Sequence, residues 1–273
     1  MKAVIEIVPE EIETRKCILI CEVSTDGFSY VVKDDESNAF VALAVYHFSN
    51  TSVPVNHFPV FKKVFEDQAL LSENYKKIYI SYSFPESVLV PFPVYNSQHN
   101  VDVLNLVHGD LTKNNAVLSD VVTEINACNI YRLPAEVTGE MNDKFPSAET
   151  CHQYSALVKN LAKSGEKVSV IFYPQKIVLM IGKEGRLLLI NSFFYKTAED
   201  VSYILLNACR QLGIEHSPLE VGGLIEKDSA LFKEIYKYFC EISFANLPVK
   251  ITSAENIAKY PIHFFSHLFA VDS

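Results

Sequence analysis

The fold of this chain is decided by residues 167–225, which read KVSVIFYPQKIVLMIGKEGRLLLINSFFYKTAEDVSYILLNACRQLGIEHSPLEVGGLI. Apolar and β-branched residues fill three short runs, separated by tight turns at Pro174-Gln175 and at 183–185, which is typical of an antiparallel meander. An amphipathic segment follows, with Thr197 placed to cap a helix, and then a fourth apolar run. The expected elements are strands 168–173, 177–181 and 186–194, helix 199–212 and strand 219–222.

The same order of elements occurs a second time, near the amino terminus. Its runs lie at 17–23, 28–33, 40–48, 58–71 and 77–83. Asp26-Gly27 stands at the first turn, where the second copy has Pro174-Gln175, and the polar run 34–38 stands at the next turn. We therefore predict an internal duplication, visible in element order and hydrophobic period.

Length and composition indicate a globular protein of two domains. The chain has 273 residues, of which 49% are hydrophobic and 21% charged. That length exceeds the usual size of one domain. We expect a first domain over 1–146, with an inserted segment at about 84–118, and a second over 147–273. The net charge of -9 and the lack of any Lys/Arg block longer than a dipeptide argue against binding to nucleic acid or to an anionic membrane.

The sequence also bears on location and on cysteine chemistry. Near the start, a short apolar run is broken by Glu6 and Pro9, and nowhere do eighteen apolar residues run together, so we expect a cytoplasmic protein with no secretory signal and no membrane span. Six cysteines without CxxC spacing lie mostly within apolar runs. We expect buried free thiols rather than a metal or redox site.

The segments outside the two copies have weaker patterns. Ser119-Asp120 resembles a helix cap, although the run up to residue 131 could instead be extended. Pro134 is placed to open a helix, and Asp228 to cap another. The remaining expectations are a strand 87–91 pairing with 77–83, a helix 148–163, a strand 247–251, a short helix from residue 253 and a buried apolar tail at 262–271.

Three runs carry a resemblance to a known family: GRLLLINSFFYKTAEDVSYILL at 185–206, NIYRLP at 129–134 and DGFSYVV at 26–32. They resemble a bacterial family of unknown function that is assigned to an actin-like fold. The repeat itself is similar to the ribonuclease-H-like module that the actin-like ATPase superfamily carries in duplicate. The resemblance implies an α/β fold with two ribonuclease-H-like domains, each a mixed five-stranded sheet with helices. It implies no particular activity.

Members of that superfamily that hydrolyse ATP have an acidic residue and a Gly-containing hairpin after the first strand of each half. The carboxylate binds magnesium and positions water, and backbone N–H groups bind the phosphates. The matching residues in the first half are Glu22, Ser24, Asp26 and Gly27, although their spacing departs from Asp-x-Gly. The matching stretch of the second half, residues 172–176, has neither acid nor Gly, and its proline lacks an N–H donor. The resemblance therefore implies a degenerate nucleotide site.

A glycine pair follows the fourth strand of the second half. Gly222 and Gly223 stand where nucleotide-binding members have glycines that allow adenine to approach the backbone. The alternative is that the pair forms an ordinary turn between strand and helix, since such pairs are common turn signals.

Other motifs for chemistry are weak or missing. His263 and His267 have the i, i+4 spacing of a helical metal chelate, but apolar residues surround them and the same turn has no acidic ligand. The sequence has no Gly-x-Ser-x-Gly, no dinucleotide fingerprint and no phosphate-loop lysine motif. We therefore predict no metal site and no nucleophile.

Two functional hypotheses follow. The preferred one is a non-catalytic actin-like scaffold or partner-binding module, which binds another protein or a second copy of itself and needs no cofactor. The alternative is an ATPase or small-molecule kinase that binds ATP and Mg²⁺. In that case Glu22, Ser24 and Asp26 would face the metal and phosphates, and Gly222 and Gly223 the adenine.

Overall fold

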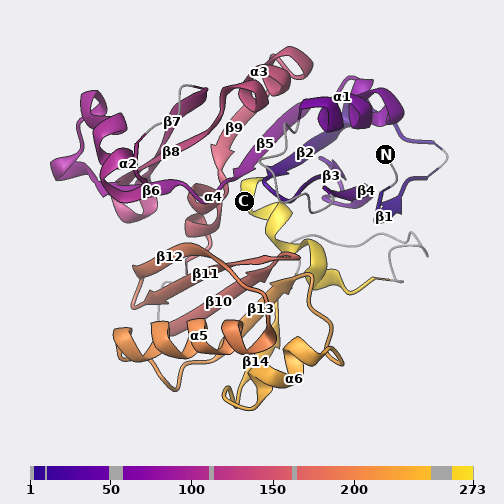
Figure 1. Cartoon of the computed structure of the whole chain (residues 1–273). Coiled ribbons are helices and arrows are strands. Elements are labelled where there is room, and N and C mark those ends of the chain that lie inside the picture. Colours follow the sequence, from indigo (N-terminus) through magenta and orange to yellow (C-terminus); the bar gives the residue numbers. More distant parts are fainter. Residues whose placement is uncertain are drawn as a thin grey trace. The chain divides into compact units, whose positions relative to one another are not determined.

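The computed structural model describes residues 3–9, 11–48, 58–110, 114–161, 165–246 and 260–272 (Figure 1). The described residues form two compact units. Unit 1 runs from the amino terminus to Ala156 and includes Asp272. Unit 2 begins at Leu157 and includes residues 260–271 of the C-terminal segment.

The main sheet of unit 1 has six strands in the order β1-β4-β3-β2-β5-β9. The strands β2, β3 and β4 form an antiparallel meander, and helix α1 leads to β5, which is parallel to β2. The predicted elements of the first copy are thereby confirmed, and β1 adds an edge strand. The bounds are β1 Ile5–Ile7, β2 Cys17–Ser24, β3 Gly27–Asp34, β4 Phe40–His47, α1 Phe58–Asp67, β5 Lys77–Ser83 and β9 Glu149–His152, with 3-10 turns at Thr14–Lys16 and Ala69–Ser72.

A second, three-stranded sheet in unit 1 has the order β6-β8-β7. Two predictions are wrong here. The strand at 87–91 exists but pairs with β8 instead of β5, and Ser119-Asp120 lies inside strand β7 instead of capping a helix. The extended alternative holds because the buried strand β8 takes an antiparallel partner on each side. The bounds are β6 Ser87–Pro91, α2 Asn100–His108, β7 Asn115–Val122, β8 Ala127–Pro134 and α3 Ala135–Lys144, with 3-10 turns at Phe92–Val94, Ser97–His99 and Thr123–Ile125.

The described residues of unit 2 form a five-stranded sheet in the order β12-β11-β10-β13-β14. The first three strands form the predicted antiparallel meander, and helix α5 leads to β13, which is parallel to β10. The bounds are β10 Glu166–Phe172, β11 Lys176–Lys183, β12 Arg186–Phe194, α5 Ala198–Leu212, β13 Leu219–Gly223, α6 Ala230–Tyr236 and β14 Ile242–Phe244.

The two large sheets have the same connectivity. The order β4-β3-β2-β5-β9 in unit 1 corresponds to β12-β11-β10-β13-β14 in unit 2, with parallel and antiparallel pairs at the same places. This is the mixed five-stranded sheet of a ribonuclease-H-like domain, present twice, so the predicted fold class is confirmed. Whether the two halves derive from one duplicated ancestor stays a prediction.

Helix α5 begins with the cap that the sequence predicts. The hydroxyl of Thr197 accepts a hydrogen bond from the backbone N–H of Asp200, and the Asp200 carboxylate accepts one from the N–H of Thr197. Such a capping box satisfies two N–H groups that the helix leaves unpaired. The buried side chains of Val201 and Leu205 then pack on the apolar face of the sheet.

Several predicted elements differ from the structure. Residues 148–163 contain strand β9 and the short helix α4, Gln153–Lys159, where the sequence predicts one helix. Helix α6 is capped by Ser229, whose hydroxyl accepts from the N–H of Phe232, and not by Asp228. The predicted strand 247–251 and the helix from residue 253 lie outside the described residues. The apolar tail is a 3-10 segment, Ile262–Asp272, with buried phenylalanines, as predicted.

Candidate functional site

The hairpin between β2 and β3 contains the candidate residues of the first half. The structure brings Glu22, Ser24, Asp26 and Gly27 together there, with Glu22 and Ser24 buried. The hydroxyl of Ser24 accepts the backbone N–H of Asp26 at 3.1 Å and donates to the carbonyl of Gly27 at 3.2 Å. Thr25 donates to the Asp26 carboxylate at 3.1 Å. The N–H of Asp26, which could otherwise donate to a phosphate, is therefore already hydrogen-bonded to Ser24 within the hairpin.

Gly27 has a packing role in this hairpin. A Cβ atom at this position would lie 2.1 Å from the carbonyl oxygen of Tyr46 on the neighbouring strand β4. Only glycine allows so close an approach of two backbones. The glycine is thus explained by strand packing, without a ligand.

Three parallel strands of unit 1 end beside one another, and a buried polar cluster lies at that edge. The amide of Gln153 donates to the Glu22 carboxylate at 3.1 Å, and the hydroxyl of Ser83 donates to the Gln153 amide oxygen at 2.8 Å. All three side chains are at most 4% exposed. We call Glu22, Ser83 and Gln153 the strand-end cluster. Sequence reasoning missed Ser83 and Gln153. Ser83 is the last residue of β5, which is parallel to β2, and Gln153 directly follows β9, which is parallel to β5.

A second polar cluster contains a serine, a histidine and an aspartate. Ser155 donates to the Asp120 carboxylate at 2.7 Å. Both ring nitrogens of His152 are bonded to backbone, since Nε2 donates to the Phe84 carbonyl at 2.8 Å and Nδ1 accepts from the N–H of Tyr154 at 3.1 Å. The histidine is therefore not oriented as a base toward the serine, as a catalytic triad requires.

The hairpin between β10 and β11 is the counterpart in unit 2. The N–H of Tyr173 donates to the Lys176 carbonyl at 2.9 Å, and Pro174 has no N–H to offer. The Lys176 side chain is fully buried, with its ammonium 4.7 Å from the centre of the Tyr173 ring. A pocket of about 720 Å³ lies next to this hairpin, but its carboxylate, Asp200, caps helix α5. The hairpin thus contains no acid and a reduced set of N–H donors.

Gly222 and Gly223 end strand β13, and the chain's own C-terminal segment covers Gly222. A Cβ atom on Gly222 would lie 2.8 Å from the hydroxyl oxygen of Ser266 and 3.5 Å from the carbonyl oxygen of His263. Gly223 has a φ of +75°, and a Cβ there would lie 2.3 Å from the Phe172 carbonyl oxygen. Local packing therefore accounts for Gly222, and the positive φ and the close backbone contact together require glycine at Gly223.

His263 fixes the segment that covers Gly222. Its Nε2 donates to the carbonyl of Ile225 at 2.6 Å, and its ring centroid lies 4.2 Å from that of Phe244. Burial lowers its pKa, so the neutral form is favoured. Within the described residues, no group of three or more His, Cys, Asp or Glu side chains is arranged to hold a metal ion.

Comparison with solved structures relates this geometry to known folds. A Bacteroides thetaiotaomicron protein with an actin-like ATPase fold and unknown function has a TM-score of 0.75 at 20% identity, covering 92% of this chain and all of that one. A type IV pilus biogenesis complex of PilM and PilN gives 0.60 at 11% identity, covering 93% and 97% of the two chains. The ethanolamine utilization protein EutJ from Carboxydothermus hydrogenoformans gives 0.50 at 10% identity, covering 97% and 91%.

At these identities the likenesses establish the fold alone, which is that of actin-like ATPases. A search of curated proteins found no match to the chain. No helix in the described part of the chain is long and apolar enough to cross a membrane. Residues 10–242 match the model of a family described as protein of unknown function (DUF3822), and the chain therefore belongs to that family.

Proposed function

We propose that this chain is a non-catalytic actin-like protein with a degenerate nucleotide site, which acts by binding a protein partner. The observation that carries the proposal is the packing of Ser266 and His263 on Gly222. At this glycine the superfamily pattern calls for open space beside the backbone, and here the chain fills that space itself.

The two hairpins support the same proposal. In unit 1, the hydroxyl of Ser24 accepts a hydrogen bond from the N–H of Asp26, and the Glu22 carboxylate accepts one from the buried Gln153 amide. In unit 2, the hairpin has Pro174 and a buried Lys176, with no acid. Phosphate binding by hairpins depends on several free N–H groups that point at one anion, and magnesium binding depends on an accessible carboxylate.

Partner binding has support from one structural neighbour. The PilM–PilN structure is, by its name, a complex of two proteins, and one of its chains shares this fold over 93% of the present chain. We extend that mode of action to this chain. The partner is expected to be another protein or a second copy of the chain.

The alternative is an ATPase or small-molecule kinase. It is favoured by one observation, the gathering of Glu22, Ser24, Asp26 and Gly27 at a single hairpin. ATP and Mg²⁺ would then be the cofactors.

A thermal-shift titration with ATP and Mg²⁺ separates the two functions. Ligand at a hundred times its dissociation constant would add about 2.7 kcal/mol to the free energy of unfolding. We expect no shift in the melting temperature, and no phosphate release above that of a Glu22→Ala variant. A saturable shift together with hydrolysis that Glu22→Ala abolishes would reject the proposal in favour of the alternative.

A further inference from the structure

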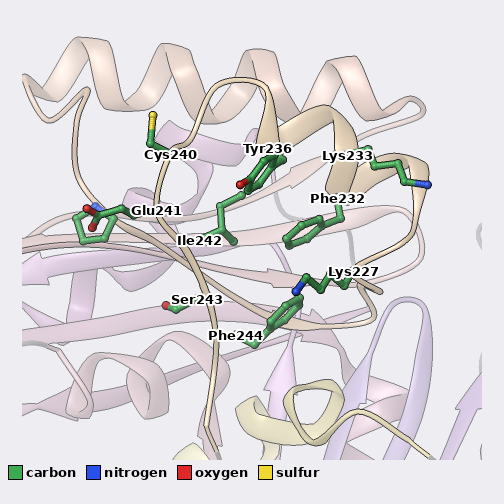
Figure 2. Close-up of a pocket in the computed structure, with 10 residues that line it drawn as sticks. Lys227, Phe232, Lys233, Tyr236, Cys240, Glu241, Ile242, Ser243 and Phe244 are labelled. Atoms are coloured by element: carbon green, nitrogen blue, oxygen red, sulfur yellow. The ribbon is translucent and has the colours of Figure 1, made fainter.

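A pocket in unit 2 lies between helix α6 and strand β14, and of the residues in the sites described above it includes only Phe244. Its volume is about 760 Å³ (Figure 2). Three aromatic rings form a stack along it. The Phe232 and Phe244 centroids are 5.4 Å apart with 12° between the rings, and Phe232 and Tyr236 are 6.1 Å apart with 21°. Tyr236 is 62% exposed, so the stack is open to a ligand on one side.

The charges around this pocket are unevenly placed. Lys227 and Lys233 line it at one end, and Glu241 lies at the other (Figure 2). Among the described residues neither of these two lysines has an ion-pair partner, whereas the neighbouring Lys237 pairs with Glu234. The chain as a whole has a net charge of -9. The charged side chains that line this end of the pocket are thus both positive, which favours an acidic group there.

The backbone of β14 has an open side next to the pocket. On one side, β14 bonds to β13. The carbonyl of Glu241 accepts from the N–H of Leu219, and the N–H of Ala245 donates to the carbonyl of Val221, so the backbone groups of Glu241 and Ala245 face β13. Backbone groups alternate in direction along a strand, so those of Ile242 and Phe244 face the opposite side. No strand in the described ranges pairs with β14 on that side.

We propose that β14 binds an extended acidic and aromatic segment of a partner protein, which adds to the sheet as a further strand. The N–H and C=O groups of Ile242 and Phe244 would pair with the segment, as in other cases of strand addition. Alternate side chains of the segment would then point toward the pocket. An aromatic side chain there would stack on the exposed ring of Tyr236, and an acidic one would pair with Lys227 or Lys233. This inference rests on the proposed partner-binding function and names the chemistry of the partner.

The test uses the full chain and fluorescence anisotropy of labelled peptides. The probe peptide has aspartate, phenylalanine and valine at alternate positions with threonine between them. A second peptide has lysine in place of aspartate, and a third has N-methyl groups on alternate residues, which remove the donors that a strand needs. The protein variants are Lys227→Glu/Lys233→Glu and Tyr236→Ala. Their matched controls are Lys62→Glu/Lys63→Glu, with the same change in net charge, and Tyr238→Ala, which removes an exposed tyrosine that does not line the pocket.

We expect the probe peptide to bind saturably and the N-methylated peptide not to bind. The lysine peptide should bind about tenfold more weakly, and so should the probe with either pocket variant, whereas both control variants should bind as the unchanged chain does. All the substituted side chains are exposed, so each variant should melt close to the temperature of the unchanged chain.

Three outcomes would overturn the inference: no binding of the probe, equal binding of the N-methylated peptide, or equal binding after the charge reversal at the two lysines. Each would leave the proposed function standing if ATP still gives no thermal shift. A saturable thermal shift with ATP and Mg²⁺, together with hydrolysis that Glu22→Ala abolishes, would reject the proposed function itself, whatever the peptides do.

Discussion

The carboxylate of Glu22 accepts a hydrogen bond from the side-chain amide of Gln153, although 131 positions separate the two residues in the sequence. Glu22 lies in β2 and Gln153 follows β9. Strand β5 lies between these two strands, and its last residue, Ser83, donates to the amide oxygen of Gln153. All three side chains are buried, and buried polar groups that lose a hydrogen-bond partner are costly. The bond therefore ties the end of β2 to the start of α4.

Replacing Glu22 tests whether this contact stabilises the fold. Glu22→Ala should lower the free energy of unfolding by about 1–3 kcal/mol, because the buried Gln153 amide loses an acceptor. Gln153→Leu should have a smaller added effect in the Glu22→Ala background than in the unchanged chain. Urea unfolding of the four proteins measures the coupling, with exposed Glu73→Ala as the control. Strictly additive losses would show that the two side chains do not depend on each other.

The glycine that ends β13 should tolerate no side chain. At Gly223 two features oppose alanine: the φ of +75°, and the Phe172 carbonyl oxygen, which would lie 2.3 Å from the new Cβ atom. Gly223→Ala should therefore cost about 1–3 kcal/mol or more. The control is Gly139→Ala inside helix α3, where a Cβ meets nothing within 4 Å, and which should gain about 0.5–1 kcal/mol. Thermal unfolding measures both, and a loss at Gly139 or none at Gly223 would contradict the geometry.

The buried histidine of the C-terminal segment should make stability depend on pH. Burial holds the pKa of His263 below its ordinary value of 6.5, so the unfolded chain binds a proton there more readily than the folded one. The stabilising contribution is then complete above about pH 6.5 and decreases as the pH falls below that value. We expect the melting temperature to fall between about pH 7 and pH 5.

His263→Asn should remove this part of the pH dependence, and exposed His216→Asn should leave it in place. Melting curves of the three proteins across the acid range make the comparison. If His263→Asn keeps the whole slope, other groups cause it.

Both meanders could be predicted from the sequence because their signals are local. Tight turns such as Pro174-Gln175 and runs of β-branched residues lie within each hairpin, so pattern and structure agree. Strands β7 and β9 depend on distant partners. Asp120 has the sequence signal of a helix cap, but its carboxylate accepts from the backbone N–H of His152 and from Ser155, both far along the chain. No local pattern indicates such contacts.

The candidate site likewise contains residues with local sequence signals and residues whose place depends on distant contacts. The residues of the first hairpin could be located because they follow one strand directly. Ser83 and Gln153 could not, since the whole three-stranded sheet lies between β5 and β9 in the sequence. The covering of Gly222 by Ser266 likewise depends on the path of the C-terminal segment. Residue types alone do not indicate that path.

Cysteine reactivity should distinguish one thiol from the others. Cys17, Cys21, Cys128 and Cys209 are buried as predicted. Cys151 is half-buried and Cys240 is exposed, which corrects the prediction for these two residues. Burial raises the pKa of Cys209 to about 11, which keeps its thiol protonated at neutral pH. A maleimide should therefore modify Cys240 first in the folded chain. Mass spectrometry should find that Cys240→Ser loses the fast reaction while Cys209→Ser keeps it; fast labelling that survives Cys240→Ser would contradict the assignment.

Arg132 should be the main polar support of the three-stranded sheet. Its buried guanidinium pairs with Glu86, and it donates to the Asn105 side chain at 3.1 Å and to the Gly109 carbonyl at 3.0 Å. Lysine cannot reproduce this fork of donors, so Arg132→Lys should be destabilised nearly as much as Arg132→Met, by about 3 kcal/mol. Exposed Arg186→Met should change little. Because the bonded groups lie just before β6 and in and after α2, hydrogen exchange should show the loss of protection there first. Uniform loss over unit 1, or full rescue by lysine, would show that the charge matters more than the geometry of the guanidinium.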